Sequence, residues 1–180
     1  MRKSNKEAAE TRQAIVAVAA DHIRRNGIAE TSLSDVMSGA GLTHGGFYKH
    51  FRSKEQLVTE ALEMAGNTTA EQIRAVRLRE GRNAAIASYL STAHRDASTP
   101  TCPMAAIGSE ATRTEGETKA AAADIIQKTV DALAEHPDAR SDALVDYATM
   151  IGTMTLARIL SGTPLSDEIL ACALQRLSQR

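Results

Sequence analysis

The segment from Gly41 to Phe51 constrains the fold of this chain more than any other stretch of the sequence. It holds three aromatic residues, in a chain that has only two Phe, three Tyr and no Trp. If the segment is helical, Phe47 and Phe51 lie four residues apart on one face, where both rings can pack into a core. Tyr48 and Lys49 then face outward. The pattern predicts a short helix that two rings hold in place while its polar face stays exposed.

Serine, threonine and glycine residues mark helix boundaries on both sides of this segment. Ser32 and Asp35 fit a capping box, with Ser32 as the N-cap of a helix that ends in a glycine turn. Gly41 suits the left-handed conformation that a tight turn between helices requires. Thr43 then caps the next helix, and Ser53 the one after it. A helix of about eight residues, a glycine turn and a second short helix have the spacing of a helix-turn-helix.

Two consecutive glycines, Gly45 and Gly46, lie inside the second of these helices. Each costs roughly 0.8–1.0 kcal/mol in a helix relative to Ala, so their presence needs a reason. One reason is functional, because a helix N-terminus without Cβ atoms can closely approach a phosphate or a base edge. The other is structural, because glycine also allows a helix to pack closely against its neighbour. The sequence leaves both explanations open.

The rest of the chain shows helical periodicity and no alternating β pattern. Its clearest loop runs from Ala97 to Pro103, around Pro100 and Cys102. The chain is therefore expected to be all-α with about nine helices, near residues 7–26, 33–39, 43–51, 54–79, 82–96, 104–113, 117–135, 139–161 and 165–178.

Charge is distributed unevenly although the net charge is only −1. Residues 1–55 hold nine Lys and Arg against six Asp and Glu, whereas residues 56–180 hold twelve against sixteen. A basic N-terminal part followed by an acidic remainder suits a protein that contacts phosphates through its N-terminal part. The alternative is that this small difference in charge arose by chance. The first basic residues have two interpretations, an arm on a phosphate backbone or a solvated terminus: Arg2, Lys3, Lys6 and Arg12.

Several classes of protein lack support in the sequence. No run of about 18 apolar residues could form a transmembrane helix, and the charged N-terminus does not resemble a secretory signal. The two cysteines, Cys102 and Cys172, match no metal-ligand spacing, which favours free thiols and a cytoplasmic protein. We recognise no catalytic triad, phosphate-binding loop or metal cluster. The expectation is therefore a chain without catalytic residues, metal or cofactor.

Together these motifs resemble the DNA-binding region of the TetR/AcrR family of bacterial transcriptional regulators. The resemblance covers about the first third of the chain, whereas the rest is similar only in length and helical plan. The matching residues are Ile15 to Gly27, Thr31-Ser32-Leu33, Ala40-Gly41-Leu42-Thr43, Tyr48, His50-Phe51, Ser53-Lys54-Glu55 and Leu57.

The resemblance implies a helix-turn-helix DNA-binding domain over residues 1–55 and a helical ligand-binding and dimerisation domain over residues 56–180. The helix from Thr43 to Phe51 would be the recognition helix on a double-stranded DNA operator. Phosphate contacts are implied for Thr43, Tyr48, His50, Lys54 and Ser32, and positions nearest the base edges for His44, Gly45 and Lys49.

The resemblance also implies a homodimer joined through the last two helices. One face of the helix over residues 139–161 suits such a contact, although the same face could be the core of a monomer: Leu144, Ala148, Ile151, Gly152, Thr155 and Ile159. A dimer would read a palindrome with two half-sites.

A small-molecule inducer of unknown identity is expected to enter the C-terminal body and to release the operator. Candidate ligand-binding residues, each also interpretable as plain core, are Met64, Tyr89, His94, Cys102, Met104 and Ile107. Cys102 precedes a helix whose dipole would favour a thiolate, so thiol modification is a second possible release signal. An inert, half-buried thiol is the alternative.

The function expected from the sequence is thus a ligand-responsive, DNA-binding transcriptional regulator, in most members of this family a repressor. Two other classes remain as alternatives. One is a helical protein-interaction module that does not bind DNA, and the other, with the least support, is a small-molecule enzyme.

Overall fold

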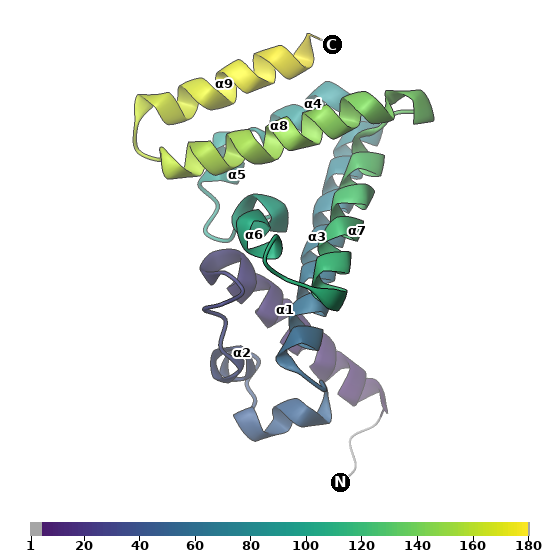
Figure 1. Cartoon of the computed structure of the whole chain (residues 1–180), viewed down its shortest axis with the longest axis vertical. Helices are drawn as coiled ribbons and strands as arrows, with labels where there is room; N and C mark the ends of the chain where they lie inside the picture. The colour runs from purple at the N-terminus through teal and green to yellow at the C-terminus, as the bar shows by residue number, and fades with distance from the viewer. Residues whose placement is uncertain (1–4, 180) are drawn as a thin grey trace.

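The structure is a computed structural model that describes residues 5–179. Over these residues it contains nine α-helices, two short 3₁₀ helices and no strand, so the all-α expectation is confirmed. Three N-terminal elements form the lower end of the molecule in Figure 1: α1 (Asn5–Asn26), α2 (Leu33–Gly39) and the 3₁₀ helix η1 (His44–Lys49).

The longest helix, α3 (Lys54–Glu80), connects this end with the rest of the molecule. It packs along α1 in its first half and along α7 (Gly116–Leu133) over much of its length. At Gly66 the two long helices come so close that an added Cβ would lie 2.6 Å from Ile125 Cγ2. Gly66 therefore permits close packing and does not interrupt the helix. Because α3 continues across residue 55, the division into domains at that position stays a prediction.

The prediction of one continuous helix over residues 82–96 is wrong. The structure has α4 (Arg82–Tyr89) and a single-turn α5 (Thr92–Arg95), separated at Leu90 and Ser91. Ser91 makes this break, since its Oγ accepts a hydrogen bond from His94 N at 3.1 Å and donates one to Ser88 O at 2.8 Å. Its hydroxyl thus caps the new turn and satisfies a carbonyl of the old helix.

Helix α6 (Pro103–Ala111) lies between the N-terminal helices and the upper part of the molecule (Figure 1). Its Glu110 carboxylate accepts hydrogen bonds from the backbone N–H groups of Ile28 and Ala29, at 2.8 and 3.3 Å. Gly27, which ends α1 with φ +89°, allows this approach, because a Cβ there would collide with the Glu110 carboxylate. A polar contact therefore joins α6 to the loop that follows α1.

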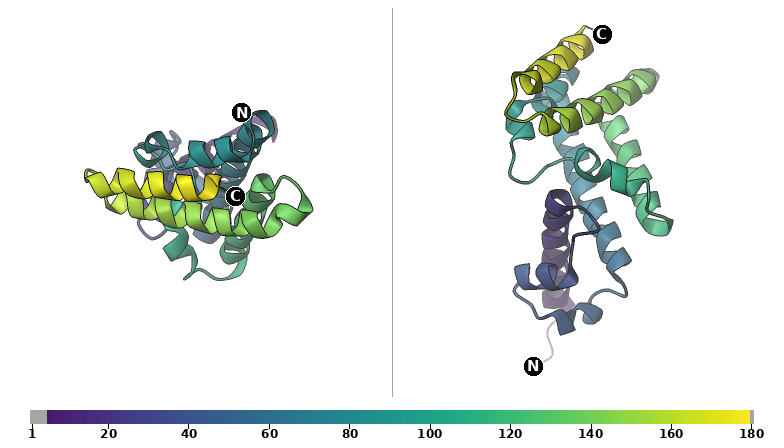
Figure 2. Two further views of the ribbon diagram at one scale, coloured as in Figure 1. Left: turned by 90° about the horizontal axis from the view of Figure 1, so that it is seen from above. Right: turned by 60° about the vertical axis from the view of Figure 1, so that its left-hand side comes forward.

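The short η2 (Pro137–Ala139) leads into α8 (Arg140–Ile159), and a tight turn then leads into α9 (Pro164–Ser178). The two long C-terminal helices lie side by side across the end of the molecule opposite η1 (Figure 2). One face of this pair carries apolar side chains into the core, among them Met150, Met154 and Leu170.

Candidate nucleic-acid interface

The turn between α2 and η1 follows from the residues at its ends. Ser32 caps α2, because its Oγ accepts a hydrogen bond from Asp35 N at 3.1 Å. Gly41 adopts φ +70°, and the chain reverses with Leu42 N donating to Met37 O at 2.8 Å. Both the cap and the glycine turn that the sequence predicts are thus confirmed.

The second helix of the motif is a 3₁₀ helix of six residues, shorter and tighter than the helix expected over 43–51. The glycines at its start are poor α-helix formers, and 3₁₀ geometry is common in such short pieces. Phe47 and Phe51 nevertheless share a face as predicted. Their rings stack with centroids 5.5 Å apart, and both are buried in the core.

Arg12 of α1 belongs to the anchor of this segment and not to an arm on DNA. Its guanidinium lies 4.6 Å from the centre of the Phe51 ring and pairs with the Glu60 carboxylate of α3. Its Nε also donates to His50 O at 3.3 Å. The interpretation of Arg12 as a phosphate contact is therefore wrong, because its donors are used inside the protein. Arg2 and Lys3 lie outside the described residues.

The buried rings leave a polar face of η1 in solvent. Tyr48 is 70% exposed, and Lys49 and His44 are exposed beside it. Thr43 is exposed and its side chain makes no capping hydrogen bond, so the predicted side-chain cap is wrong and the hydroxyl is available to a ligand. His50, at the end of η1, is half-buried against Phe51.

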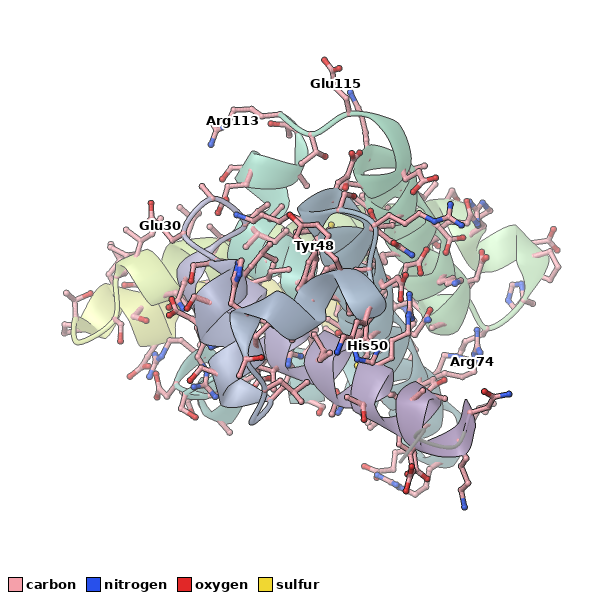
Figure 3. The ribbon with its side chains drawn as sticks, turned by 90° about the horizontal axis from the view of Figure 1, so that it is seen from below. Glu30, Tyr48, His50, Arg74, Arg113 and Glu115 are labelled. Carbon is pink, nitrogen blue, oxygen red and sulfur yellow. The ribbon has the colours of Figure 1, made fainter. Side chains whose placement is uncertain are left out.

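Figure 3 looks directly at this end of the molecule. Tyr48 and His50 lie on the η1 segment near the middle of the view, whereas Glu30 and Glu115 lie toward its rim. The labelled carboxylates therefore lie to the sides of the η1 polar face in this view, and do not lie over Tyr48 or His50.

The structure separates the two explanations for the glycines. A Cβ added to Gly45 would meet no atom within 4 Å, and one added to Gly46 would lie 3.5 Å from Met37 Cε, an ordinary contact. Close helix packing therefore does not require glycine at either position. The exposed backbone at Gly45 leaves room for a close approach from outside, which favours the functional explanation.

Two other predicted contacts lie at the edge of this face. Lys54 is the first residue of α3 and is half-buried. The Ser32 hydroxyl is already used as the α2 cap. Sequence reasoning also missed Arg52, which is exposed directly after Phe51. The sequence does contain a hint of it, because Arg52 is a cation in the short polar connection between Phe51 and the N-cap Ser53.

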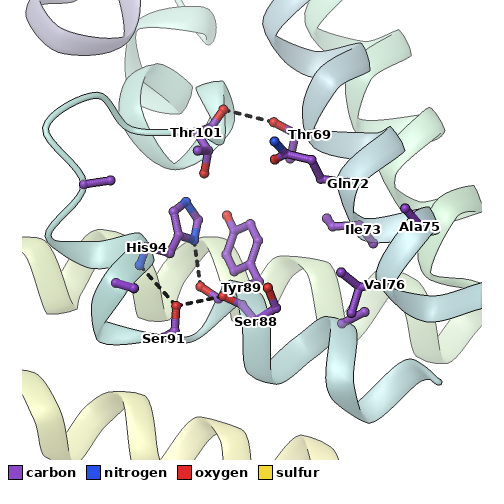
Figure 4. A pocket seen from close by; sticks show the side chains of 13 residues that line it. Thr69, Gln72, Ile73, Ala75, Val76, Ser88, Tyr89, Ser91, His94 and Thr101 are labelled. Carbon is purple, nitrogen blue, oxygen red and sulfur yellow. Dashed lines mark hydrogen bonds between the residues drawn. The ribbon is translucent and has the colours of Figure 1, made fainter. Parts of the chain in front are cut away.

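The candidate ligand-binding residues do not all come together. Tyr89 and His94 line a cavity of about 440 Å³ between α3, α4 and α5, together with Thr69, Gln72, Ile73 and Thr101 (Figure 4). Cys102 is fully buried, with its Sγ 3.7 Å from Tyr147 Oη. The expectation of a half-buried thiol is therefore wrong.

Three further candidates lie elsewhere. Met104 and Ile107 are buried in the core and do not line this cavity. Met64 lines a different hollow, beside Arg12 and Glu60. The spacing of apolar residues cannot distinguish a cavity wall from solid core, because both require the same side chains.

The outer face of α8 and the start of α9 hold most of the exposed large apolar side chains among the described residues. These are Leu144, Val145, Leu156, Ile159 and Leu165. Of the six residues predicted for a dimer contact, Ala148 and Gly152 are also exposed, whereas Ile151 and Thr155 are half-buried. Thr155 donates a hydrogen bond to Ala105 O at 3.2 Å.

No helix in residues 5–179 is long and apolar enough to cross a membrane. Nor do three or more His, Cys, Asp or Glu side chains of this range gather where they could hold a metal ion.

Comparisons with known proteins agree with this geometry. The sequence model of a family described as "Bacterial regulatory proteins, tetR family" matches residues 15–61, which include α2, η1 and the start of α3. The HTH-type transcriptional regulator AcrR of Shigella flexneri is 39% identical over 70 residues, which are 39% of this chain and 33% of that protein. The chain thus spans about a third of the length of this curated relative.

Solved structures extend the similarity to nearly the whole chain. A TetR transcriptional regulator from Chloroflexus aurantiacus is 30% identical, with a TM-score of 0.77 over 97% of this chain and 95% of that one. The reduced form of Escherichia coli NemR has the same TM-score over 94% and 96% of the two chains. Its identity is 20%, so this second likeness concerns the fold alone.

Proposed function

Because the chain belongs to the tetR family of bacterial regulatory proteins, we propose that it is a transcriptional repressor that binds a palindromic DNA operator as a homodimer. A small molecule bound in the C-terminal body releases the operator. The exposed polar face of η1, anchored from behind by Phe47 and Phe51, carries this proposal. It presents Tyr48, Lys49 and His44 at one end of the molecule, outside any core.

In this proposal the residues of η1 divide into two roles. Thr43 and Tyr48 donate hydrogen bonds to phosphates and fix the register of the helix, as do His50, Lys54 and Ser32 at its margins. His44, Gly45 and Lys49 lie nearest the base edges. Exposure of Thr43 and Tyr48 and the open space around Gly45 support these roles.

Replacing both Tyr48 and Lys49 with Ala is expected to weaken operator binding by about 100-fold or more. The Lys49 base contact is worth about 1–3 kcal/mol, and a dimer loses it in both half-sites, about 2–6 kcal/mol together. The lost Tyr48 phosphate contacts add to this. The operator would first be selected from a pool of random-sequence duplexes, and affinity then measured by fluorescence anisotropy at several salt concentrations. The slope of affinity against salt should also fall, because each protomer brings one cation fewer, Lys49, to the DNA.

Leu78 and Arg79 provide a matched control at the opposite end of α3. Leu78 is 70% exposed, like Tyr48, and Arg79 is an exposed cation like Lys49. The double replacement Leu78→Ala/Arg79→Ala should leave operator affinity unchanged. Equal operator affinity of the Tyr48/Lys49 double variant and the wild type would contradict the proposed interface. If the wild type selects no duplex from the pool, the result favours a protein-interaction module without DNA binding.

The dimer contact is proposed on the outer face of α8 and α9. Leu144 and Ile159 lie at the two ends of this face, and Ile159 is 74% exposed. Small residues between them, Ala148 and Gly152, permit a partner helix to approach closely. A two-fold contact there would cover most of the exposed apolar surface.

Sedimentation at micromolar concentration tests this contact. The wild type is expected to sediment at about twice the mass of the 19.2 kDa chain. Ile159→Asp should shift it toward the monomer, since two unpaired carboxylates would be buried across the two-fold axis. Leu78→Asp, equally exposed but outside this face, should leave the dimer intact. A wild-type monomer at these concentrations would refute the proposed contact.

For the inducer, the cavity beside Tyr89 and His94 is the favoured site. Its volume of about 440 Å³ falls within the range of small-molecule pockets. Thiol modification is the less supported release signal, because the Cys102 sulfur is fully buried, whereas reactive thiols lie in partly exposed positions.

A further inference from the structure

The cavity beside Tyr89 and His94 differs from four other hollows of residues 5–179 in the charge of its wall. None of the thirteen residues that line it is Asp, Glu, Lys or Arg, although these four types make up 24% of the chain. An ionised ligand in this cavity would therefore find no counter-ion on the wall. The other hollows have charged linings, for example Lys54, Glu55 and Glu115 around the start of α3, or Arg82, Glu135, Asp138 and Asp142 around the start of α8.

The two titratable residues of this wall do not supply a charge either. Burial raises the pKa of Tyr89 well above its usual value, so its phenol stays protonated. Burial lowers the pKa of His94, so its ring is neutral at pH 7. The two rings meet edge to face with centroids 4.6 Å apart. Together they form an uncharged aromatic corner of the cavity.

A cation of α8, Arg158, contacts this corner but is closed off from the cavity. Its Nη2 donates to His94 O at 3.2 Å, yet Arg158 does not line the cavity. Arg158 Nε and Nη1 are buried, and so are Tyr89 Oη and His94 Nε2. An occupant of the cavity therefore meets carbon atoms of the two rings and does not reach the guanidinium.

Two neutral polar side chains of the wall are available to a ligand. Gln72 is exposed on α3, and Thr101 is half-buried in the loop before α6. Within residues 5–179 neither the Gln72 amide nor the Thr101 hydroxyl makes a hydrogen bond, whereas the Thr69 hydroxyl donates to Thr101 O at 3.0 Å. Figure 4 shows the Gln72 side chain extending from α3 toward Thr101 at one end of the space. An amide and a hydroxyl can each donate and accept, so this pair suits a neutral polar group.

We propose that the ligand of this cavity is an uncharged organic molecule with an apolar body and one neutral polar group, a carbonyl, amide or hydroxyl. The Gln72 amide and the Thr101 hydroxyl bind the polar group, and the body lies against Ile73, Val76 and Ala85 on the α3 and α4 walls. The wall disfavours anions and cations alike, because an ion loses hydration there without gaining a partner of opposite charge. This inference rests on the proposed function in taking the ligand as the inducer, while the binding itself does not depend on DNA.

Calorimetry with ligands that differ only in charge tests this preference. Octanamide and 4-phenylbutanamide would be titrated into the full-length protein at pH 7, each beside the carboxylate and the primary amine with the same apolar body. Each amide is expected to bind at least about 10-fold more tightly than its two charged counterparts. A carboxylate or an ammonium that binds as tightly as its amide would overturn the proposal, and so would no binding of either amide at millimolar concentration.

The double replacement Gln72→Leu/Thr101→Val tests the two polar partners. It should weaken amide binding by about 3- to 10-fold, because the amide group of the ligand loses its hydrogen bonds. The thermal unfolding midpoint should change little, since neither side chain group bonds within the protein. Gln13→Leu, at an exposed glutamine of α1 outside this cavity, is the matched control and should leave amide affinity unchanged. Equal amide affinity in the double variant and the wild type would overturn the proposed roles.

Val76→Trp tests whether the amide occupies this cavity. Val76 is half-buried on the α3 wall, and the larger ring should fill space that the ligand needs. Amide binding should be lost in this variant. Unchanged amide affinity would place the ligand elsewhere and overturn the proposal. If Val76→Trp lowers the unfolding midpoint strongly, the Gln72→Leu/Thr101→Val variant decides the question.

Operator binding distinguishes this inference from the proposed function. If the inference and the function both hold, octanamide or 4-phenylbutanamide weakens the binding of wild-type protein to the selected operator. Amide binding by a protein that selects no DNA would remove the proposed function and leave this site. DNA binding without amide binding would do the reverse.

Discussion

Phe47→Ala is expected to lower the free energy of unfolding by about 3–5 kcal/mol. The Phe47 side chain is fully buried, stacks on Phe51 and meets the Tyr48 ring edge to face at 5.1 Å. Its removal leaves a cavity where η1 joins the core, and this short 3₁₀ helix has few other apolar contacts to hold it. Operator binding should therefore be lost together with stability.

Urea unfolding followed by far-ultraviolet circular dichroism measures this effect, since the chain has no Trp to report by fluorescence. Protein concentration must be held fixed, because the proposed dimerisation would contribute to the apparent stability. Phe47→Leu, which keeps most of the buried volume, should cost less than about 1.5 kcal/mol. A loss below about 1 kcal/mol in Phe47→Ala would show that η1 is held mainly by other contacts.

The helix boundaries were predictable because they depend on local chemistry. The N-cap hydroxyls of Ser32 and Ser53 accept hydrogen bonds from backbone N–H groups three positions away, and Gly41 supplies the positive φ of the turn. Such local roles can be predicted from the sequence alone. The break at Ser91 was missed for a related reason. A serine within a helical pattern is compatible with a continuous helix, and the hydrogen bond to Ser88 O that ends α4 becomes evident only in the structure.

Contacts between distant segments could not be predicted in this way. Arg12 resembled a phosphate contact because its partners, Phe51 and Glu60, are about forty or more positions away.

Arg82→Met is expected to lower the free energy of unfolding by about 3–5 kcal/mol, because it leaves a buried carboxylate without its counter-ion. Asp146 on α8 has no exposed surface, and its Oδ2 accepts hydrogen bonds from Arg82 Nη2 at 2.5 Å and Nε at 3.0 Å. Arg82 Nη1 also donates to Leu177 O on α9 at 3.1 Å. One guanidinium thus links the start of α4 to both C-terminal helices.

The double replacement Arg82→Met/Asp146→Leu decides whether this cost comes from the unpaired charge. Removing both charges should restore most of the stability lost in Arg82→Met, since apolar pairs replace buried ion pairs at little cost. If the double variant is no more stable than Arg82→Met, the loss comes instead from the Leu177 contact and from packing.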